Sequence, residues 1–179
     1  MKNFLSILSL SVMLLACSTS TQSPTSSPQS STVNLPDHKN ATYLIEGSFV
    51  TLTNGFFEVE SAPGSATKIT TRYFGNEAIG DLNNDGKVDI AFLLTQSSGG
   101  SGTFFYVVAA IQTSNGVEGT NAIFLGDRIA PQGTSMENGI ITVNYADRNP
   151  GEPFTTQPSL GVSKYFKIEN NILTKTQNP

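Results

Sequence analysis

The sequence predicts an all-β domain, built as a single antiparallel sheet of the meander type that curls into a barrel or a sandwich. One observation is a set of three Asn-Gly pairs between β-rich runs, at positions 54–55, 115–116 and 138–139. Asn-Gly supplies the two positive-φ positions that a tight hairpin turn requires. The other observation is that no apolar period of about 3.6 residues is sustained, as a long helix would require.

The expected strands are the runs of β-branched and aromatic residues between these turns. In chain order they are the runs 42–52, 56–60, 68–74, 88–94, 103–113, 140–146, 162–168 and 172–175. Runs 88–94 and 103–113 are almost continuously apolar, so we expect them to be the most buried strands. A flexible Gly/Ser-rich loop joins these two runs, and the proline-rich segment 150–159 predicts an irregular connection. One short helix, near 64–67 or 76–79, is compatible with the pattern.

The N-terminus has the features of an export signal. A positive start precedes an apolar run over residues 4–15, which is too short to span a bilayer as a stable helix. The motif LLAC at 14–17 resembles a bacterial lipobox, and Cys17 is the only cysteine of the chain. We therefore expect residues 1–16 to be a lipoprotein signal peptide and Cys17 to be the lipidated first residue of the mature chain. An ordinary secretory signal with a chance cysteine is the alternative.

Lipidation of Cys17 has a physical consequence for location. More than one acyl chain, palmitate among them, gives stable membrane anchoring where a single chain is marginal. We expect an exported protein anchored to a membrane of the bacterial cell envelope. In a Gram-negative host this is the outer membrane, because Ser18 does not resemble the aspartate-type signal for retention in the inner membrane. Without a second cysteine, the fold cannot rely on a disulfide.

Residues 17–40 follow the signal and are dominated by Ser, Thr, Pro and Gln. Such a segment has too little apolar surface to offset the entropy of ordering, so we expect a disordered tether that begins with the lipidated cysteine. His38, the only histidine, is expected to be an exposed residue of this tether. Residues 41–179 then form a single β domain with a sizeable core.

Charge and composition narrow the classes of function. The net charge is −4, and removal of the signal with Lys2 leaves −5, so without a basic patch nucleic acid binding is not expected. The predicted domain has neither cysteine nor histidine, which removes Cys-His, Ser-His-Asp and His-ligated zinc sites. Asp127-Arg128 is either a binding pair or a surface charge contact at a strand end. A glycosidase-like carboxylate pair stays open, drawn from Glu58, Glu60, Asp127, Glu137, Asp147 and Glu152.

The segment GDLNNDGKVD, residues 80–89, has oxygen-bearing side chains at alternating positions. A hard cation such as Ca²⁺ takes about six to eight oxygens, and Gly86 at position 6 permits the sharp turn that such a loop needs. Position 12 is Phe92 where an EF-hand has a bidentate glutamate, so the segment is not an EF-hand. The expected ligands, at positions 1, 3, 5, 7 (the carbonyl oxygen) and 9, are Asp81, Asn83, Asp85, Lys87 and Asp89.

The alternative for this segment is a polar turn without metal, in which the aspartates cap local backbone amides. Bound calcium would be structural, since it would pin two strands by cancelling carboxylate repulsion. Without a bidentate glutamate, the affinity would be modest, near the ~10⁻⁴–10⁻³ M of extracellular modules. Asn84 lies outside the ligand pattern and is expected to be dispensable.

The pattern Asp-x-Asn-x-Asp-Gly-x-x-Asp, with a strand on each side, resembles the calcium loops of FG-GAP-type repeats in integrin-like β-propellers. This resemblance covers residues 74–94 and implies that the matching side chains and the Lys87 carbonyl bind calcium. No second copy is found, so the propeller fold is not implied. Three segments, FGNEAIGDLNNDGKVDIAFLL at 74–94 and the strands GSGTFFYVVAAI at 100–111 and IFLGDRI at 123–129, carry a second resemblance. Through them residues 41–179 resemble an uncharacterised family of bacterial lipoproteins, which supports the boundaries and the location but implies no activity.

Together these features predict a membrane-anchored exported lipoprotein with a calcium-stabilised β domain. We expect a monomer that is not an enzyme and that acts as a binding or envelope-structural module for an unknown envelope or extracellular partner. A binding module predicts an exposed aromatic patch that uses Tyr106, Tyr145 or Tyr165, whereas a structural protein predicts none. The alternative is a hydrolase that acts on an envelope or extracellular polymer through a carboxylate pair.

Overall fold

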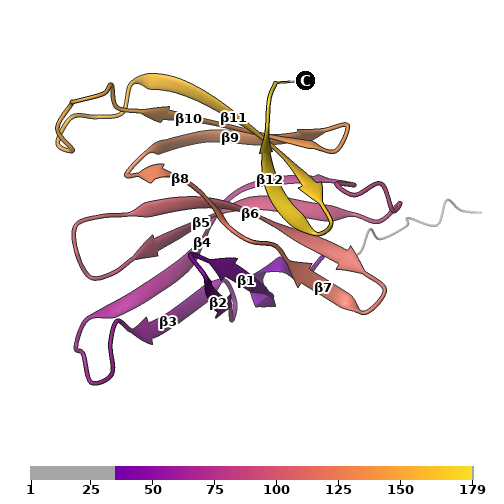
Figure 1. The fold of residues 1–179 in the computed structure, drawn as a ribbon, viewed down its shortest axis with the longest axis horizontal. Coiled ribbons are helices and arrows are strands. Elements are labelled where there is room, and N and C mark those ends of the chain that lie inside the picture. Colours follow the sequence, from indigo (N-terminus) through magenta and orange to yellow (C-terminus); the bar gives the residue numbers. More distant parts are fainter. Residues whose placement is uncertain (1–34, 179) are drawn as a thin grey trace, which may run out of the picture. The chain divides into compact units, whose positions relative to one another are not determined.

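A computed structural model of the chain describes residues 35–178 (Figure 1). This part of the chain begins with a short 3-10 turn, η1 (His38–Asn40), and continues in strands. In chain order the strands are β1 (Thr42–Ile45), β2 (Ser48–Thr51), β3 (Phe56–Glu60), β4 (Lys68–Gly80), β5 (Asp89–Ser97), β6 (Phe104–Thr113), β7 (Gly116–Gly119), β8 (Ile123–Asp127), β9 (Ala130–Glu137), β10 (Ile140–Asp147), β11 (Leu160–Glu169) and β12 (Ile172–Thr176).

The strands form three antiparallel sheets. The largest has the order β3-β4-β5-β6-β7, with β8 also paired to β6; the second has the order β12-β11-β10-β9; the third is the hairpin β1-β2. Figure 1 shows the four-stranded sheet above the six-stranded sheet and the hairpin below it. The prediction of an antiparallel all-β fold is therefore confirmed. The architecture is a sandwich of three sheets rather than one curled sheet.

Strands β5 and β6 form the centre of the molecule and are buried on both faces. Leu93 and Val107 belong to the core beneath the four-stranded sheet, whereas Phe92 and Val108 belong to the core above the hairpin. All four side chains have no exposed surface. A strand that is buried on both faces needs apolar residues at consecutive positions, which is why these two runs do not alternate. The prediction that they are the most buried strands is confirmed.

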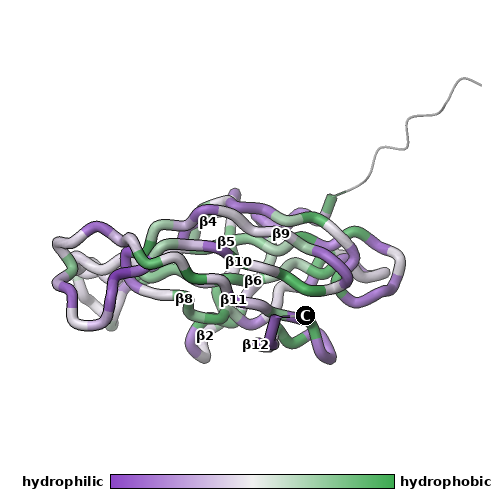
Figure 2. The backbone as a smooth tube through the Cα atoms, turned by 90° about the horizontal axis from the view of Figure 1, so that it is seen from above, coloured by the Kyte–Doolittle hydropathy of each residue, from purple (hydrophilic) through white to green (hydrophobic). Residues whose placement is uncertain are grey.

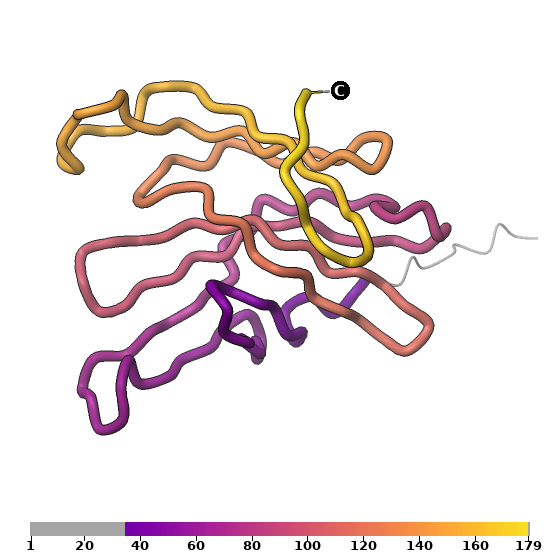
Figure 3. Tube along the Cα trace, in the orientation of Figure 1, coloured from indigo at the N-terminus to yellow at the C-terminus, as the bar shows by residue number. Residues whose placement is uncertain are grey.

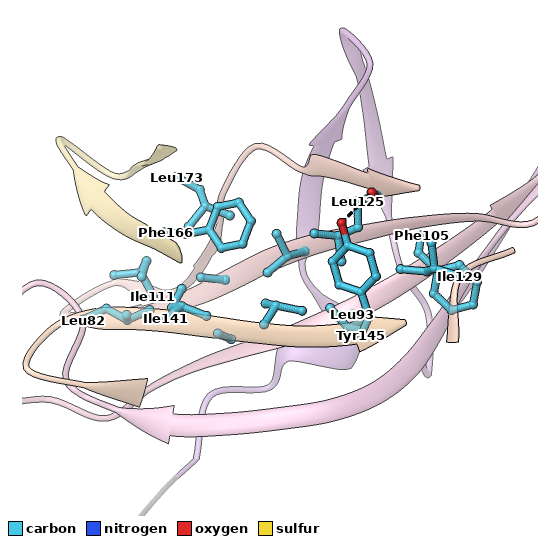
Figure 4. Close-up of a cluster of buried hydrophobic side chains, with 14 residues drawn as sticks. Leu82, Leu93, Phe105, Ile111, Leu125, Ile129, Ile141, Tyr145, Phe166 and Leu173 are labelled. Carbon is cyan, nitrogen blue, oxygen red and sulfur yellow. Dashed lines mark hydrogen bonds between the residues drawn. The ribbon is translucent and has the colours of Figure 1, made fainter. Parts of the chain in front are cut away.

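The core beneath the four-stranded sheet contains one polar contact. Tyr145 is buried, and its phenol donates a hydrogen bond to the carbonyl oxygen of Leu125 over 3.1 Å (Figure 4). Burial raises the pKa of this phenol to about 12, so it remains a donor at neutral pH. Figure 4 also shows Phe166 beside Leu173, which belong to β11 and β12. The four-stranded sheet therefore closes its face of the central sheet with large apolar side chains.

The hairpin covers only part of the opposite face. Its strands have 4 residues each, whereas β5 and β6 have 9 and 10. Figure 3 traces this hairpin in indigo below the longer strands of the central sheet. The residues of the hairpin and the sheet that pack together include Tyr43, Val50 and Leu52 on one side and Phe92 and Leu94 on the other. Phe57 and Phe104 of the sheet are only partly buried and pack against the margin of this core.

Two departures from the sequence-based prediction concern turns. Run 42–52 is not one strand, because Glu46 and Gly47 adopt positive φ values of 48° and 80° and turn the chain into the hairpin. No helix occurs within 64–67 or 76–79, and the second of these ranges continues β4. There the register with β5 shifts around Gly75, whose φ is 115°, so bulges rather than a helix account for this part of the pattern.

Strands β7 and β9 were not predicted. Strand β9 contains Pro131 and Gly133, which are both unfavourable inside a central strand. Both residues are tolerated because β9 is the last strand of its sheet and pairs on one side only, with β10. The predicted irregular segment 150–159 does connect β10 to β11 without a strand. In Figure 2 hydrophobic stretches run along the strands, whereas hydrophilic residues gather in several of the loops.

Candidate metal site

The candidate metal loop, residues 81–88, joins β4 to β5. Gly80 at the end of β4 is paired with Asp89 at the start of β5, so the sheet fixes both ends of the loop. The predicted position of this segment between two strands is confirmed. The loop is consequently a closed hairpin connection whose geometry depends on its own side chains.

Three of the expected ligand side chains turn inward onto the backbone of the loop. Asp81 accepts hydrogen bonds from the N–H groups of Asp85 at 3.2 Å and Gly86 at 2.8 Å. Asn83 Oδ1 also accepts from the Asp85 N–H, at 3.0 Å, and Asp85 Oδ1 accepts from the Lys87 N–H at 2.9 Å. These bonds are the local capping contacts of a polar turn. They also bring side-chain oxygens from three alternating positions to one side of the same short loop.

Two residues of the loop have left-handed backbone conformation. Gly86 has a φ of 82°, in agreement with the expected sharp turn. Asn84 has a φ of 59°, a region that most side chains avoid and that asparagine tolerates better than others. The turn therefore favours asparagine or glycine at position 84, and the expectation that Asn84 is dispensable for metal binding stays a prediction.

Asp89 is the anchor of the loop. It has no exposed surface, and its two carboxylate oxygens accept backbone hydrogen bonds from Leu82 and Gln112, both at 2.9 Å. Burial raises the pKa of this carboxyl despite the two hydrogen bonds, and the negative charges of Asp85 and Asp81 raise it further. Three carboxylates thus influence one another across the loop. A cation between them would relieve this repulsion.

The side chain of Lys87 places a positive charge beside the loop. Its ammonium lies 3.2 Å from Asp85 Oδ2, in a pair that is largely open to solvent. The backbone hydrogen bond from Lys87, together with this ammonium, lowers the pKa of the Asp85 carboxyl. The side chain of Lys87 therefore points back to Asp85, and only its carbonyl oxygen is a candidate ligand.

The donor chemistry of the loop fits a hard cation, because every candidate ligand atom is oxygen and each capped carboxylate oxygen has a second lone pair. Within residues 35–178 no three His, Cys, Asp or Glu side chains already surround a point where an ion would sit. The carboxylate of Asp89 is directed at Leu82 and Gln112 instead. The residues that would hold calcium are accordingly Asp81, Asn83, Asp85 and the Lys87 carbonyl, with Asp89 as a more distant ligand.

His38 is not an exposed tether residue, and this expectation was wrong. It is 9% exposed, and its ring packs at 5.0 Å from the ring of Phe92 and at 5.6 Å from that of Tyr73. Its Nδ1 faces the carbonyl oxygen of Pro36 at 3.0 Å, and its Nε2 lies 2.7 Å from Glu77 Oε1. Nε2 is therefore within ion-pair range of the Glu77 carboxylate.

Residues just before position 41 therefore pack on the domain. The sequence offered one sign of this packing, which we missed. Within Leu35 to Lys39, two residues just before the first strand, Pro36 and His38, are buried. The phenol of Tyr43 completes this contact by donating to the carbonyl oxygen of His38 over 2.7 Å. The short turn η1 therefore closes one end of the hairpin core.

The tyrosines expected in an exposed aromatic patch are mostly internal. Tyr106 and Tyr145 are 2% and 1% exposed, so neither can form such a patch, and Tyr165 is half-buried. The exposed aromatic side chains are phenylalanines instead. Phe49 on β2 is the most exposed of them, at 77%.

Asp127 and Arg128 form an internal contact at the end of β8. Arg128 Nη2 lies 2.9 Å from Asp127 Oδ2, and the other oxygen accepts a hydrogen bond from the Thr103 N–H at 2.9 Å. Burial raises the pKa of Asp127, but these bonds outweigh it and lower the pKa overall. The guanidinium of Arg128 also lies 4.1 Å from the ring centre of Phe154. This geometry is that of a charge contact that ties loops together.

Two of the carboxylates considered for a hydrolase are engaged in local contacts. Three cavities lined by described residues each contain one carboxylate, from Glu118, Glu46 and Glu137 respectively. Glu58 is engaged by the ammonium of Lys68. Glu152 caps Asn149 through its backbone and side-chain N–H groups.

Cys17 and the predicted signal lie outside residues 35–178. In the part of the chain that the structure describes, no helix is long and apolar enough to cross a membrane. Comparison of the chain with models of known protein families, with curated proteins and with solved structures finds no match. The functional argument therefore rests on the residues themselves.

Proposed function

We propose that this protein is an exported, lipid-anchored binding module of the bacterial cell envelope, without catalytic activity. Cys17 in the lipobox-like motif carries the anchor, and the Ser/Thr/Pro-rich segment after it is the tether. A flexible tether lets a domain reach partners away from the membrane surface.

The observation that carries the binding role is the uneven covering of the six-stranded sheet. One face is closed by the four-stranded sheet and the other by the short hairpin β1-β2 and the turn η1. A cavity of about 330 Å³ remains between hairpin and sheet, lined largely by apolar side chains such as Phe57 and Ile69. Phe49 at its rim is 77% exposed. Concave apolar sites with few polar groups are the usual form of ligand sites.

In this proposal calcium has a structural role in the loop between β4 and β5. Asp81, Asn83 and Asp85, with the Lys87 carbonyl, hold the ion while Asp89 anchors the loop to the core. The ion offsets the repulsion between the carboxylates and pins the two strands. The loop lies apart from the cavity, since none of its residues lines it.

The anchoring part of the proposal is tested by expression of the full chain in a bacterial host, beside a Cys17→Ser variant. The wild-type chain is expected in the membrane fraction, with an acylated Cys17 at its N-terminus by mass spectrometry. The Cys17→Ser variant is expected to lose both the acylation and the membrane association. A wild-type chain that stays soluble with residues 1–16 attached would reject the proposal.

A further inference from the structure

Two adjoining cavities form one groove beside the hairpin tip, which we define as the tip groove. The first cavity measures about 330 Å³ and the second about 210 Å³. Glu46, Ile69 and Gln96 line both of them, so the two cavities adjoin.

The floor of the tip groove is a stretch of the six-stranded sheet that is covered only in part, since Thr71 is buried whereas Phe57 and Phe104 are half-buried. Phe57 is paired with Thr71, Thr71 with Gln96, and Gln96 with Phe104, so these four residues form one row across β3, β4, β5 and β6. The next row towards the end of the sheet begins with the pair Val59 and Ile69, and Val59 is 47% exposed. The floor is therefore apolar at both sides, with an amide in its middle.

One carboxylate, that of Glu46, stands over this floor. Its Oε1 accepts a hydrogen bond of 2.7 Å from the buried phenol of Tyr106. Within residues 35–178 the ion pairs of the acidic side chains leave Glu46 without a cationic partner. A negative charge at an apolar groove is complementary to a ligand with the opposite charge.

The backbone of Glu46 adds a second observation. Its φ of 48° lies in the left-handed region, at a turn position that asparagine or glycine fills at lower cost. Unfavourable backbone conformations of this kind are concentrated at functional sites. Here the left-handed turn directs the Glu46 side chain towards Tyr106 and the groove.

We propose that the tip groove binds a small amphipathic cation, with an ammonium head at Glu46 and an apolar tail along Phe57, Val59 and Ile69. The volume of the groove suits a small molecule rather than a macromolecule. Phe104 and Tyr106 line the same lobe as Glu46, and aromatic rings also attract ammonium groups. This inference rests on the proposed binding role, and it depends neither on the anchor nor on the calcium loop.

Titration calorimetry with three probes of six carbons each tests the ligand class: n-hexylammonium, 1-hexanol and hexanoate. The protein is the mature chain, residues 17–179 with Cys17→Ser. We expect saturable binding of hexylammonium, weaker binding of hexanol and none of hexanoate. Glu46→Gln removes the charged acceptor for the ammonium group but keeps an oxygen acceptor for Tyr106. It should therefore lower the affinity for hexylammonium about tenfold or more.

The matched control is Glu58→Gln, which makes the same change of charge on β3 but beside the groove-facing positions 57 and 59. It should leave hexylammonium binding unchanged. A second readout uses the absence of tryptophan from the chain. Hexylammonium should change the fluorescence of a Phe49→Trp variant at the groove and not that of a Phe154→Trp variant.

Equal binding of hexanoate and hexylammonium, or an unchanged affinity in Glu46→Gln, would overturn the proposal. Absence of binding by all three probes at millimolar concentration would overturn it as well. Each titration is repeated in calcium and in chelator. If calcium does not stabilise the protein but hexylammonium still binds, only the calcium part of the proposed function is rejected. If calcium stabilises the protein but hexylammonium does not bind, only the proposal for the groove is rejected.

Discussion

The carboxylate of Asp89 accepts a hydrogen bond from the backbone N–H of Gln112 over 2.9 Å and so ties the start of β5 to the far end of β6. Its other oxygen holds the N–H of Leu82 at the same distance. A single buried side chain therefore connects the candidate metal loop to the central strand pair. The stability of the loop and that of the core are coupled through this residue.

Asp89→Ala should be strongly destabilising even without calcium. The substitution leaves the N–H groups of Leu82 and Gln112 without their acceptor, and a lost bond to a charged group costs about 1.5–3 kcal/mol. We expect a loss of roughly 3–5 kcal/mol in urea unfolding, measured in chelator. Asp85→Ala in the same loop is the control and should change stability little, because Asp85 is exposed. Equal effects of the two substitutions would contradict the anchoring role of Asp89.

Asn84 should tolerate glycine but not valine. Its φ of 59° is accessible to glycine, whereas a β-branched residue pays a steric penalty of about 1–2 kcal/mol in this region. We expect Asn84→Val to lower the free energy of unfolding by that amount and Asn84→Gly to change it by less than half as much. Similar stabilities for both variants would show that the loop does not keep this conformation.

Gly119 should be irreplaceable for a different reason. A Cβ atom at this position would lie 2.2 Å from the Thr42 carbonyl oxygen and 2.7 Å from the Tyr43 ring, so β1 and β7 would have to separate. We expect Gly119→Ala to cost about 1–3 kcal/mol, as in other overpacked sites. Gly133→Ala is the matched control, since nothing lies within 4 Å of its Cβ position. The comparison is made by thermal unfolding, and a neutral Gly119→Ala would disprove the close approach of these strands.

Glu77 should contribute to acid sensitivity. Burial alone raises its pKa, but the hydrogen bond from Tyr73 at 2.6 Å and the charge of His38 outweigh burial and lower the pKa overall. The unfolded chain therefore binds the proton more tightly than the folded chain does. The stabilisation by this group is complete above the unfolded pKa of about 4.3 and is lost as pH falls through the folded value.

The measurement for Glu77 is the midpoint of thermal unfolding from about pH 6 to about pH 3. Glu77→Gln should show a shallower decline than the wild type over the lower part of this range, because it has no proton to bind. Lys39, also close to Glu77, stays charged throughout and does not change the sign. Parallel curves for the two proteins would contradict the lowered pKa.

The fold could be predicted where a residue pattern is compatible with only one kind of secondary structure. The continuous apolar runs that became β5 and β6 and the Asn-Gly turns at 54–55 and 138–139 belong to this class. The pair Glu46-Gly47 was missed because glutamate is a poor turn residue, and its side chain matters through Tyr106, 60 positions away. Strand β9 was missed because an edge strand with Pro131 lacks the usual strand composition.

For the site, the sequence located the loop but not the direction of its side chains. The alternating aspartates are compatible with both metal ligation and capping of amides, because both uses need inward-facing oxygens. The anchoring of Asp89 to Gln112 depends on the pairing of β5 with β6, which no local pattern contains. His38 was misjudged for the same reason, since Phe92 and Glu77 reach it from distant strands.

Thermal unfolding of the mature chain, residues 17–179 with Cys17→Ser, in about 10 mM calcium and then in excess chelator tests the central claim most directly. This concentration is about 10–100 times the expected dissociation constant of ~10⁻⁴–10⁻³ M, so binding to the folded state alone adds about 1.4–2.7 kcal/mol, which is a rise of a few degrees. The account predicts this rise in the wild type and its loss in the Asp81→Ala, Asp85→Ala double variant. Cooperative melting at the same temperature in both buffers would contradict it, and residues 81–88 would then be a metal-free turn.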